Sequence, residues 1–472
     1  MTHPGSSLPA FRQRALIAIE DIRLQTALDG ATGRFSSARQ AALGDYPQAG
    51  ELRDRLKAIR AATLARLAEH LQTFERNAQA AGAQVHWASS AEEACQAVLA
   101  IAARHQVTLA AKSKSMATEE IGLNRALQEA GIRPVETDLG EWIIQLAEES
   151  PYHIIAPAIH KTRGQVAELF RRESGRDDIP ADIPALTAEA RRMLREKFLA
   201  AGLGISGGNL LVAETGSVVL VTNEGNGRMV TSAPPVHIAV VGIEKVAPTW
   251  DDAAVWLSLL ARSATGQPLS IYTSIITGPA RPGDPDGPQE VHVLLVDNGR
   301  SRLLGTQYEE VLQCIRCGAC LNVCPVYREA GGHAYGSPYS GPIGAVISPL
   351  LFGLEPYAAL PQASSLCGAC LDVCPVRIDL PRMLLALRAD EVAQGILPRP
   401  ERAAERTAAR VMASPRLYRL AARLLRQGQR PLRQGGHLRL PPQLHPAPGR
   451  ELPSLAPRPF RAIWQDELEH DS

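Results

Sequence analysis

Two cysteine runs constrain this chain more than any other feature of its sequence. They hold seven of the eight cysteines: Cys314, Cys317, Cys320, Cys324, Cys367, Cys370 and Cys374. The first run has the spacing C-x2-C-x2-C-x3-C-P, and the second repeats its last part, C-x2-C-x3-C-P. Thiolates spaced in this way converge on one cluster in bacterial ferredoxins. The segment is therefore predicted to fold around iron–sulfur clusters, which replace part of an apolar core.

The last cysteine of each run is predicted to bind the cluster of the other run. The first cluster then has the ligands Cys314, Cys317, Cys320 and Cys374, and the second has Cys324, Cys367 and Cys370. We expect two [4Fe-4S] clusters, and the second lacks one cysteine because Ser364 stands where the eighth ligand would be. Its fourth ligand is left open between Ser364, Ser365, His333, solvent and a partner group, and a three-iron cluster is also left open. Unequal ligation predicts unequal reduction potentials.

Zinc, disulfides and a purely structural role are the alternatives for these cysteines. Zinc also binds paired C-x2-C loops, but each tetrahedral site needs four ligands, which the spacing does not supply twice. Disulfide frameworks are typical of small secreted chains, whereas this chain has 472 residues. Two clusters with a purely structural role would not need to lie close together or to have unequal ligands. A short electron relay does need both features. The remaining cysteine, Cys95, is expected to be a small buried hydrophobe on a helix over 91–103.

Helix and strand patterns alternate through residues 51–304. Apolar residues at helical spacing predict one long amphipathic helix over 51–80. Strand patterns with helical patterns between them lie at 85–87, 107–111 and 133–137, and more strands are expected at 210–214, 217–222, 236–241, 270–276 and 291–296. The turn Thr215-Gly216 predicts a hairpin. This order indicates an α/β domain with a parallel sheet and flanking helices.

The net charge and the hydropathy pattern of the chain argue against several classes of function. The formal net charge of +1 gives no global field for nucleic acid. No stretch approaches the ~18 apolar residues that span a bilayer, and residues 1–23 lack a secretory pattern. We therefore expect a cytoplasmic protein that does not bind nucleic acid.

The last part of the chain is basic and rich in proline. Residues 399–464 contain 14 Arg and 3 Glu. The composition predicts a solvated helix followed by a tail that wraps a partner. Peripheral attraction to the anionic inner face of the membrane is the alternative.

Glycine turns in the α/β segment gather groups that suit a small anion. Between Glu214 and Arg228 lie a carboxylate, hydroxyls, an amide and a guanidinium, and amides near Gly216, Gly225 and Gly227 suit an anion nest. The residues Lys112, Ser113, Lys114 and Ser115 stand between a strand and a helix, where a helix N-terminus favours negative charge. Turn chemistry and capping by Ser115 and Thr118 explain the same residues without a ligand. The sequence predicts no catalytic residue.

Four histidines are weaker candidates for functional residues. His153, His160 and His237 lie beside strand patterns without a ligand spacing and are expected to be core or surface residues. His333 lies in a glycine-rich loop between the cysteine runs, where it is a loop hydrogen-bonder or, alternatively, a cluster ligand or proton relay.

These residues together resemble the lactate-utilization protein B family. The segments that carry the resemblance, besides the cysteine runs, are 114–116, 118–120, 136–141, 213–217, 223–228, 331–336 and 339–346. The resemblance implies an N-terminal extension (1–50), a LUD-type α/β domain of NagB/RpiA/CoA-transferase-like architecture (51–304), a small α-helical ferredoxin-like dicluster domain (305–396) and a basic, Pro-rich C-terminal region (397–472).

The same resemblance implies the function. The chain is expected to be the iron–sulfur electron-transfer subunit of a complex that oxidises L-lactate to pyruvate. Its implied partners are a cysteine-rich iron–sulfur subunit and a second LUD-domain protein, with L-lactate bound at the level of the complex. The alternatives are an α/β domain that itself binds or converts a small carboxylate, with clusters in a regulatory or structural role, and an assembly scaffold.

Overall fold

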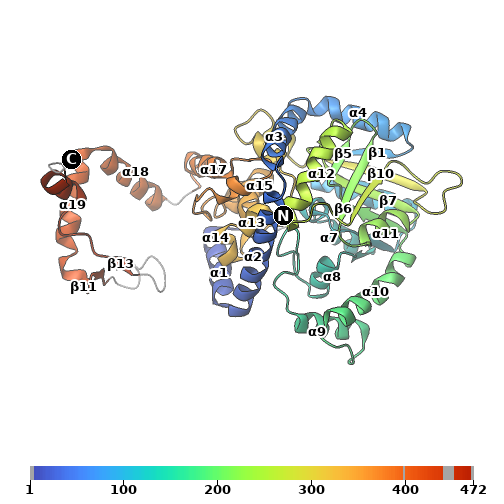
Figure 1. The fold of residues 1–472 in the computed structure, drawn as a ribbon, viewed down its shortest axis with the longest axis horizontal. Helices are drawn as coiled ribbons and strands as arrows, with labels where there is room; N and C mark the ends of the chain where they lie inside the picture. Colours follow the sequence, from blue (N-terminus) through green and yellow to red (C-terminus); the bar gives the residue numbers. More distant parts are fainter. Residues whose placement is uncertain (1–4, 397–398, 440–450, 469–472) are drawn as a thin grey trace. The chain divides into compact units, whose positions relative to one another are not determined.

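The computed structural model describes residues 5–396, 399–439 and 451–468 (Figure 1). Contacts within the chain divide it into two compact units, Met1–Glu391 and Val392–Ser472. Each unit is described by itself. The predicted division of the chain into four segments stays a prediction.

A six-stranded sheet organises the first unit. Its strands, in spatial order, are β1 (Gln84–Ala88), β10 (Glu290–Val296), β7 (Val236–Gly242), β4 (Leu203–Ser206), β2 (Leu109–Lys112) and β3 (Arg133–Glu136). Every neighbouring pair is parallel. The inner strands are runs of buried aliphatic residues, as a sheet covered on both faces requires. The predicted α/β class with a parallel sheet is confirmed.

A second sheet packs beside the first and is mostly antiparallel. Its order is β8 (Val246–Ala247), β5 (Leu210–Val212), β6 (Ser217–Thr222) and β9 (Tyr272–Ile276). β5 and β6 form the predicted hairpin. Gly216 in its turn has φ 68°, and a Cβ there would lie 2.1 Å from the Ala78 amide nitrogen. Only glycine lets this turn approach the helix that carries Ala78.

Helices pack against the two sheets of the first unit, and on both faces of the parallel one. They are α3 (Ala49–Ala65), α4 (Leu67–Ala80), α5 (Ala91–Arg104), α6 (Met116–Glu120), α7 (Leu123–Glu129), α8 (Leu139–Leu146), α9 (Arg163–Ser174), α10 (Ile183–Ala200), α11 (Asn226–Ser232) and α12 (Trp250–Thr265). Buried residues of α5 and α7 pack on one face. Those of α8, α9 and α10 pack on the other face over β2 and β3.

Two sequence predictions in this region were wrong in detail. The helix expected over 51–80 is two helices, α3 and α4, because Arg66 leaves the helical conformation at φ −124° and ψ 30°. The helical pattern expected between the strands at 107–111 and 133–137 is likewise two helices, α6 and α7, separated by Gly122 at φ 67°. Cys95 does lie on the predicted helix, α5, but it is only partly buried, and its thiol donates to the Ile121 carbonyl oxygen at 3.4 Å.

Short helices form the cysteine-rich module. They are α13 (Ala319–Asn322), α14 (Pro325–Ala330), α15 (Gly341–Phe352), α16 (Ala369–Val373) and α17 (Leu380–Gln394). The N-terminal helices α1 (Leu8–Glu20) and α2 (Ile22–Gly44) pack against α14 and α13 (Figure 1). One apolar core runs without interruption from β7 and β10 through α12 into this module. The cysteine loops are therefore held rigidly against the α/β region.

The second unit contains the basic end of the chain. It has the helices α18 (Arg399–Ala413), α19 (Pro415–Gly428) and α20 (Phe460–Ile463), and a small sheet of β11 (Arg433–Gln434), β12 (His437–Leu438) and β13 (Leu452–Pro453). Part of the predicted Pro-rich tail, 440–450, lies outside the described residues. Nowhere in the described chain is a helix both long enough and apolar enough to cross a membrane.

Candidate iron–sulfur site and adjacent cavity

Each cysteine run folds as a loop that enters a short helix at a left-handed glycine. Gly318 has φ 76° and begins α13, and Gly368 has φ 83° and begins α16. A side chain would be strained at these angles, so both turns favour glycine. The repeat in sequence is thus a repeat in structure, with Cys320 and Cys370 at equivalent positions of two short helices.

The structure brings the seven cysteines of the runs together in two neighbouring sets. The first set, Cys314, Cys317, Cys320 and Cys374, lines one small cavity. In the second set, Cys324, Cys367 and Cys370 lie within electrostatic reach of one another. Cys320 also lies within reach of Cys370, so the two sets adjoin. This grouping matches the two predicted ligand sets, while ligation itself stays a prediction.

The spacing of the sulfurs suits clusters better than single zinc ions. Around one tetrahedral zinc, sulfurs at ~2.3 Å from the metal lie about 3.8 Å apart. In the described residues, no three cysteine sulfurs lie within 4.8 Å of one another. Burial raises the pKa of Cys317 and Cys370 to about 12 and of Cys374 to about 11, so these thiols need a bound cation to become thiolates. The residues therefore fit iron–sulfur clusters.

Cationic side chains surround the first set. Four of them donate to backbone carbonyl oxygens of the cysteine loops: Arg39 to Val373 at 2.7 Å, Arg53 to Cys374 at 2.8 Å, Arg60 to Leu312 at 2.9 Å and Lys245 to Cys314 at 2.9 Å. Arg60 is completely buried. Buried cations are costly without a counter-charge, which an anionic cluster would provide.

The second set lies closer to the surface. Cys367 is exposed, unlike the other cysteines of the runs. Hydrogen bonds from the Ala369 amide and then from the Ser365 hydroxyl lower the pKa of Cys367. Ser364 instead accepts from the Leu366 amide at 3.1 Å, and His333 donates to the Ser150 carbonyl oxygen at 2.8 Å. Of the three side chains predicted as alternatives for the missing ligand, Ser365 is therefore the one in contact with a cysteine of this set.

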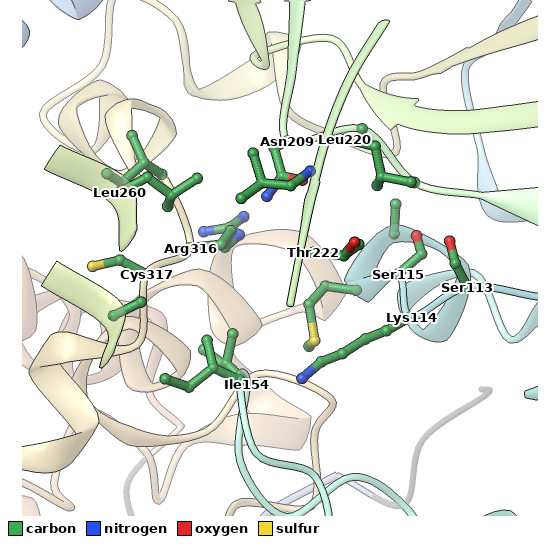
Figure 2. A pocket seen from close by; sticks show the side chains of 18 of the residues that line it. Ser113, Lys114, Ser115, Ile154, Asn209, Leu220, Thr222, Leu260, Arg316 and Cys317 are labelled. Atoms are coloured by element: carbon green, nitrogen blue, oxygen red, sulfur yellow. The ribbon is translucent and has the colours of Figure 1, made fainter. Parts of the chain in front are cut away.

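A cavity of about 380 Å³ lies between the parallel sheet and the first cysteine set (Figure 2). The segments after β2, β4 and β7 form one side of it, at Ser113, Gly207 and Gly242. The loop with Arg316 and Cys317 forms the opposite side. Ligands of open α/β sheets commonly bind at such carboxyl ends of strands.

Polar atoms without partners line this cavity. Ser113 Oγ, Asn226 Oδ1 and Arg316 Nη1 are buried and make no hydrogen bond within the protein. Figure 2 shows the Lys114 side chain extending from the end of β2 toward the cavity. Buried polar atoms are rarely left unpaired. The cavity is therefore built for a polar ligand or ordered water. Its lining has four cations (Lys114, Lys245, Arg300 and Arg316) and three carboxyl groups (Asp138, Glu224 and Glu244), so an anion is favoured on the side of Lys114 and Arg316.

A buried ion-pair network fixes Arg316. Its guanidinium lies 4.7 Å from the centre of the Tyr339 ring and 3.7 Å from Glu244. The Tyr339 hydroxyl donates to Glu120 at 2.5 Å, and Arg300 pairs with Glu120 at 2.7 Å and Glu244 at 2.6 Å. The Arg300 guanidinium holds the pKa of both carboxyl groups down despite burial, which by itself raises it. Arg316 was not identified from the sequence as a candidate anion-binding residue, although it stands between Cys314 and Cys317.

The predicted anion-binding residues are not brought together as a group. Glu214 accepts from the Trp250 amide at 2.9 Å and so caps α12, and Arg228 lines a separate surface groove beside β9. Lys112 is buried and bonded to Glu136 at 2.5 Å. Ser115 caps α6, as the capping alternative predicted, but also lines the cavity.

Other residues of the predicted anion-binding segments do meet at the cavity: residues 220–224 and Asn226 line it together with Ser113 and Lys114. Burial, and then the charge of Asp138, raise the pKa of Glu224 to about 7. Lys245 also lines the cavity, and burial and then the charge of Arg316 lower its pKa to about 7. Glu224 and Lys245 therefore both titrate near neutral pH.

Two of the three histidines expected to be structural have ordinary partners. His153 is bonded to Asn322 at 3.1 Å, and His237 to Ser206 at 2.8 Å. His160 is different, because it lies beside Glu149 and His333. No spacing of these three residues in the sequence predicts that they meet.

Comparison with known proteins places these features in a family. Residues 71–296 match the LUD domain, and residues 310–378 match the 4Fe-4S dicluster domain. "Uncharacterized electron transport protein YkgF" of Escherichia coli (strain K12) is 44% identical over 410 residues, which cover 87% of this chain and 86% of that protein.

Two proteins named "Lactate utilization protein B" are similar over the same regions. That of Shouchella clausii is 42% identical over 418 residues, covering 88% of this chain and 87% of its own. That of Oceanobacillus iheyensis is 40% identical over 467 residues, covering 98% and 97%. The chain therefore belongs to the lactate utilization protein B family, with a LUD domain and an iron–sulfur dicluster domain.

Proposed function

We propose that this chain is the iron–sulfur electron-transfer subunit of a complex that oxidises L-lactate to pyruvate. In this proposal Cys314, Cys317, Cys320 and Cys374 hold one cluster, and Cys324, Cys367 and Cys370 hold the other. Each cluster, when bound, supplies a one-electron redox centre. The observation that carries the proposal is the gathering of the seven cysteines into two adjoining sets of different exposure.

The difference in exposure between the two cysteine sets suggests the direction of electron transfer. The first set adjoins the polar cavity, which also includes Cys317. The second set reaches the surface at Cys367. We propose that electrons enter at the first set and leave from the second, where a partner can approach. Ser365 is proposed as the oxygen ligand that completes the second set when no partner supplies one.

The proposed partners are a cysteine-rich iron–sulfur subunit and a second LUD-domain protein. The second unit of the chain offers a surface for one of them. Along α19, Leu417, Leu420 and Leu424 recur at helical spacing and are 46–59% exposed. Arginines occupy the intervening positions. Such a helix suits an acidic protein groove, and an anionic membrane face is the competing partner that the chemistry allows.

A second candidate function is supported by the cavity itself. Three unpartnered buried polar atoms and the cations Lys114 and Arg316 suit a small carboxylate. In this version the LUD domain binds the carboxylate, and the clusters have a regulatory or structural role. The cavity serves both hypotheses, so only a redox measurement separates them.

The test is lactate-dependent reduction of the clusters in the complex reconstituted from this chain and its two proposed partners. We expect bleaching of the iron–sulfur absorbance on adding L-lactate, and loss of bleaching in Cys317→Ser. Lactate binding to the complex without any bleaching, while dithionite still reduces the clusters, would support the second candidate instead.

A further inference from the structure

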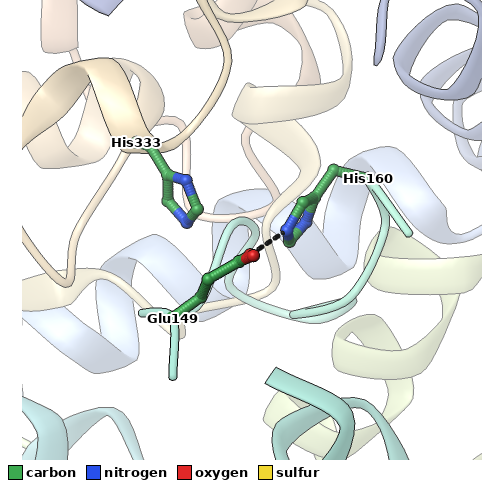
Figure 3. Close-up of side chains that lie close together, drawn as sticks. All are labelled: Glu149, His160 and His333. Atoms are coloured by element: carbon green, nitrogen blue, oxygen red, sulfur yellow. Dashed lines mark hydrogen bonds and ion pairs between the residues drawn. The ribbon is translucent and has the colours of Figure 1, made fainter. Parts of the chain in front are cut away.

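Three side chains outside the cysteine sets form a compact group of metal-binding type. Glu149 and His160 come from the segment between α8 and α9, and His333 comes from the cysteine-rich module (Figure 3). One possible ligand atom from each residue lies within 4.8 Å of those of the other two. Neither the cysteine ligation nor the cavity uses any of them.

Hydrogen bonds leave donor atoms of this group available. His333 Nε2 donates to the Ser150 carbonyl oxygen at 2.8 Å, which leaves the lone pair on Nδ1. A metal-binding histidine commonly makes such a bond with its other nitrogen. His160 Nδ1 is buried without a hydrogen-bond partner, and His160 Nε2 lies 2.6 Å from Glu149 Oε2. Lys161 pairs with the other carboxylate oxygen and orients Glu149.

Close packing holds the two imidazoles in place. The Tyr152 ring stacks on His160 and meets His333 edge-on, with both ring centres 4.5 Å away. Gly331 and Gly332 permit this approach, because a Cβ on Gly332 would lie 1.8 Å from the Tyr152 carbonyl oxygen. The His160 side chain is 10% exposed and Glu149 is 30% exposed. The group is therefore ordered, yet an ion can reach it from solvent.

We propose that Glu149, His160 and His333 bind one divalent transition-metal ion, zinc or ferrous iron. Two imidazole nitrogens and one carboxylate oxygen are a usual ligand set for both metals and leave a further position for water. The ion would join the LUD segment to the cysteine-rich module. Beside it, Tyr327 of α14 donates to the Tyr152 carbonyl oxygen at 3.0 Å, and Cys324 caps the N-terminus of α14. Metal binding would thus stiffen the contact behind the second cysteine set.

Zinc is the probe for the test, on the full chain purified without oxygen and with its iron–sulfur clusters intact. After washing with a mild chelator, zinc is titrated, and bound zinc and iron are measured together by elemental analysis. We expect about one zinc per chain. Glu149→Gln and His333→Gln, changed on opposite sides of the contact, should each weaken zinc binding at least tenfold with the iron content unchanged.

Two control variants separate the site from general histidine binding. His86→Gln disrupts the other close histidine pair, in which His86 lies 3.0 Å from His292, and should leave zinc binding unchanged. His105→Gln disrupts another histidine–carboxylate pair, in which His105 Nε2 lies 3.3 Å from Glu290 Oε2, and should also leave zinc binding unchanged. The proposal is overturned if the wild-type chain takes up no zinc, or if Glu149→Gln and His333→Gln bind it as tightly as His86→Gln does.

Hydrogen exchange gives a readout that does not depend on variant folding. Zinc should slow amide exchange in residues 147–162 of the wild-type chain, because the ion ties that segment to the cysteine-rich module. Zinc uptake without slower exchange in this segment would place the ion elsewhere and overturn the proposal.

Discussion

The two cysteine sets differ in burial and in the charge around them. The first set lies under Arg39, Arg53, Arg60 and Lys245, whose side chains bond the backbone of its loops. The second set has three cysteines, one of them exposed, and a serine hydroxyl bonds to that exposed cysteine.

This difference has an electrostatic consequence. Cations around a buried site offset the cost of placing an anionic cluster there, so the first set is suited to hold its cluster tightly. In the second set Cys324 and Cys370 are buried but Cys367 is exposed, so solvent or a partner group can approach this set at Cys367. The proposed transfer of electrons to a partner needs one protected site and one accessible site, and the two sets are arranged in that way.

Removing a thiolate should have the largest effect, and it should be larger at the buried set. Cys317→Ser is expected to lose about half of the iron, because an entire cluster depends on the first set. Cys367→Ser removes an exposed ligand beside Ser365 and should lose less. The measurement is iron and sulfide per chain. Cys95→Ser is the matched control, since Cys95 lies on α5 away from both sets. Equal losses of iron in Cys317→Ser and Cys367→Ser would contradict the proposed difference between the two sets.

Neutralising Arg60 should weaken the fold around the first set. Its guanidinium donates to the carbonyl oxygens of Glu244, Val246 and Leu312. Arg60→Met would leave these buried acceptors unpaired, at a cost of about 3 kcal/mol in the free energy of unfolding. Chemical denaturation of the cluster-containing chain measures the change. Arg66→Met, at the exposed break between α3 and α4, is the control and should unfold like wild type.

Anion binding in the cavity should affect the first cluster and not the second. L-lactate or a non-oxidisable analogue should change the paramagnetic resonance signal of the first cluster, because the cavity includes Cys317. Lys114→Gln should weaken that binding by about tenfold, the effect of roughly 1.4 kcal/mol. A change confined to the second cluster's signal would mean that the anion binds elsewhere.

The same binding should weaken as pH rises through about 7. Burial raises the pKa of Glu224 to about 7, so this cavity carboxyl is mostly protonated below that pH and ionised above it. Its negative charge then opposes an anionic ligand, and we expect about a fivefold loss of affinity between pH 6 and pH 8. Calorimetric titration of the wild-type chain and Glu224→Gln tests this. The variant should show a shallower profile, because Lys245, whose pKa burial lowers to about 7, still loses its charge in the cavity. A slope as steep in Glu224→Gln as in wild type would contradict the role of Glu224.

The smallest effect is expected from Ser365. Ser365→Ala removes the proposed oxygen ligand, which solvent can replace, so the second cluster should be kept. Its potential should shift by tens of millivolts, where about 60 mV corresponds to 1.4 kcal/mol for one electron. The first cluster's potential should not change. Ser364→Ala is the matched control, because the Ser364 hydroxyl bonds the Leu366 amide instead. An effect of Ser364→Ala as large as that of Ser365→Ala would contradict the assignment.

Local patterns predicted those parts of the molecule that depend on short stretches of chain. The cysteine spacing predicted two sets, and the alternation of apolar segments predicted the parallel sheet and the β5–β6 hairpin. The break at Arg66 was not predicted, because apolar residues continue at helical spacing across it. Whether a helix bends there depends on what its two halves pack against, which is not a local property.

Contacts between distant segments account for what the sequence could not predict. Arg316 faces the cavity only because Tyr339 and Glu244, from different parts of the chain, surround it. Glu214 and Arg228 were predicted to belong to one anion-binding segment. In the structure Glu214 caps α12, whereas Arg228 lines the groove beside β9. His333 meets His160 only when the glycine loop packs on Tyr152. The spacing of residues along the sequence does not predict which distant side chains come into contact.

Paramagnetic resonance during stepwise reduction, with iron and sulfide analysis, tests the central claim most directly. On the chain purified without oxygen, the account predicts seven to about eight iron atoms per chain and two signals that appear at different potentials. A colourless chain with little iron, or one zinc ion for each set of cysteines, would contradict it.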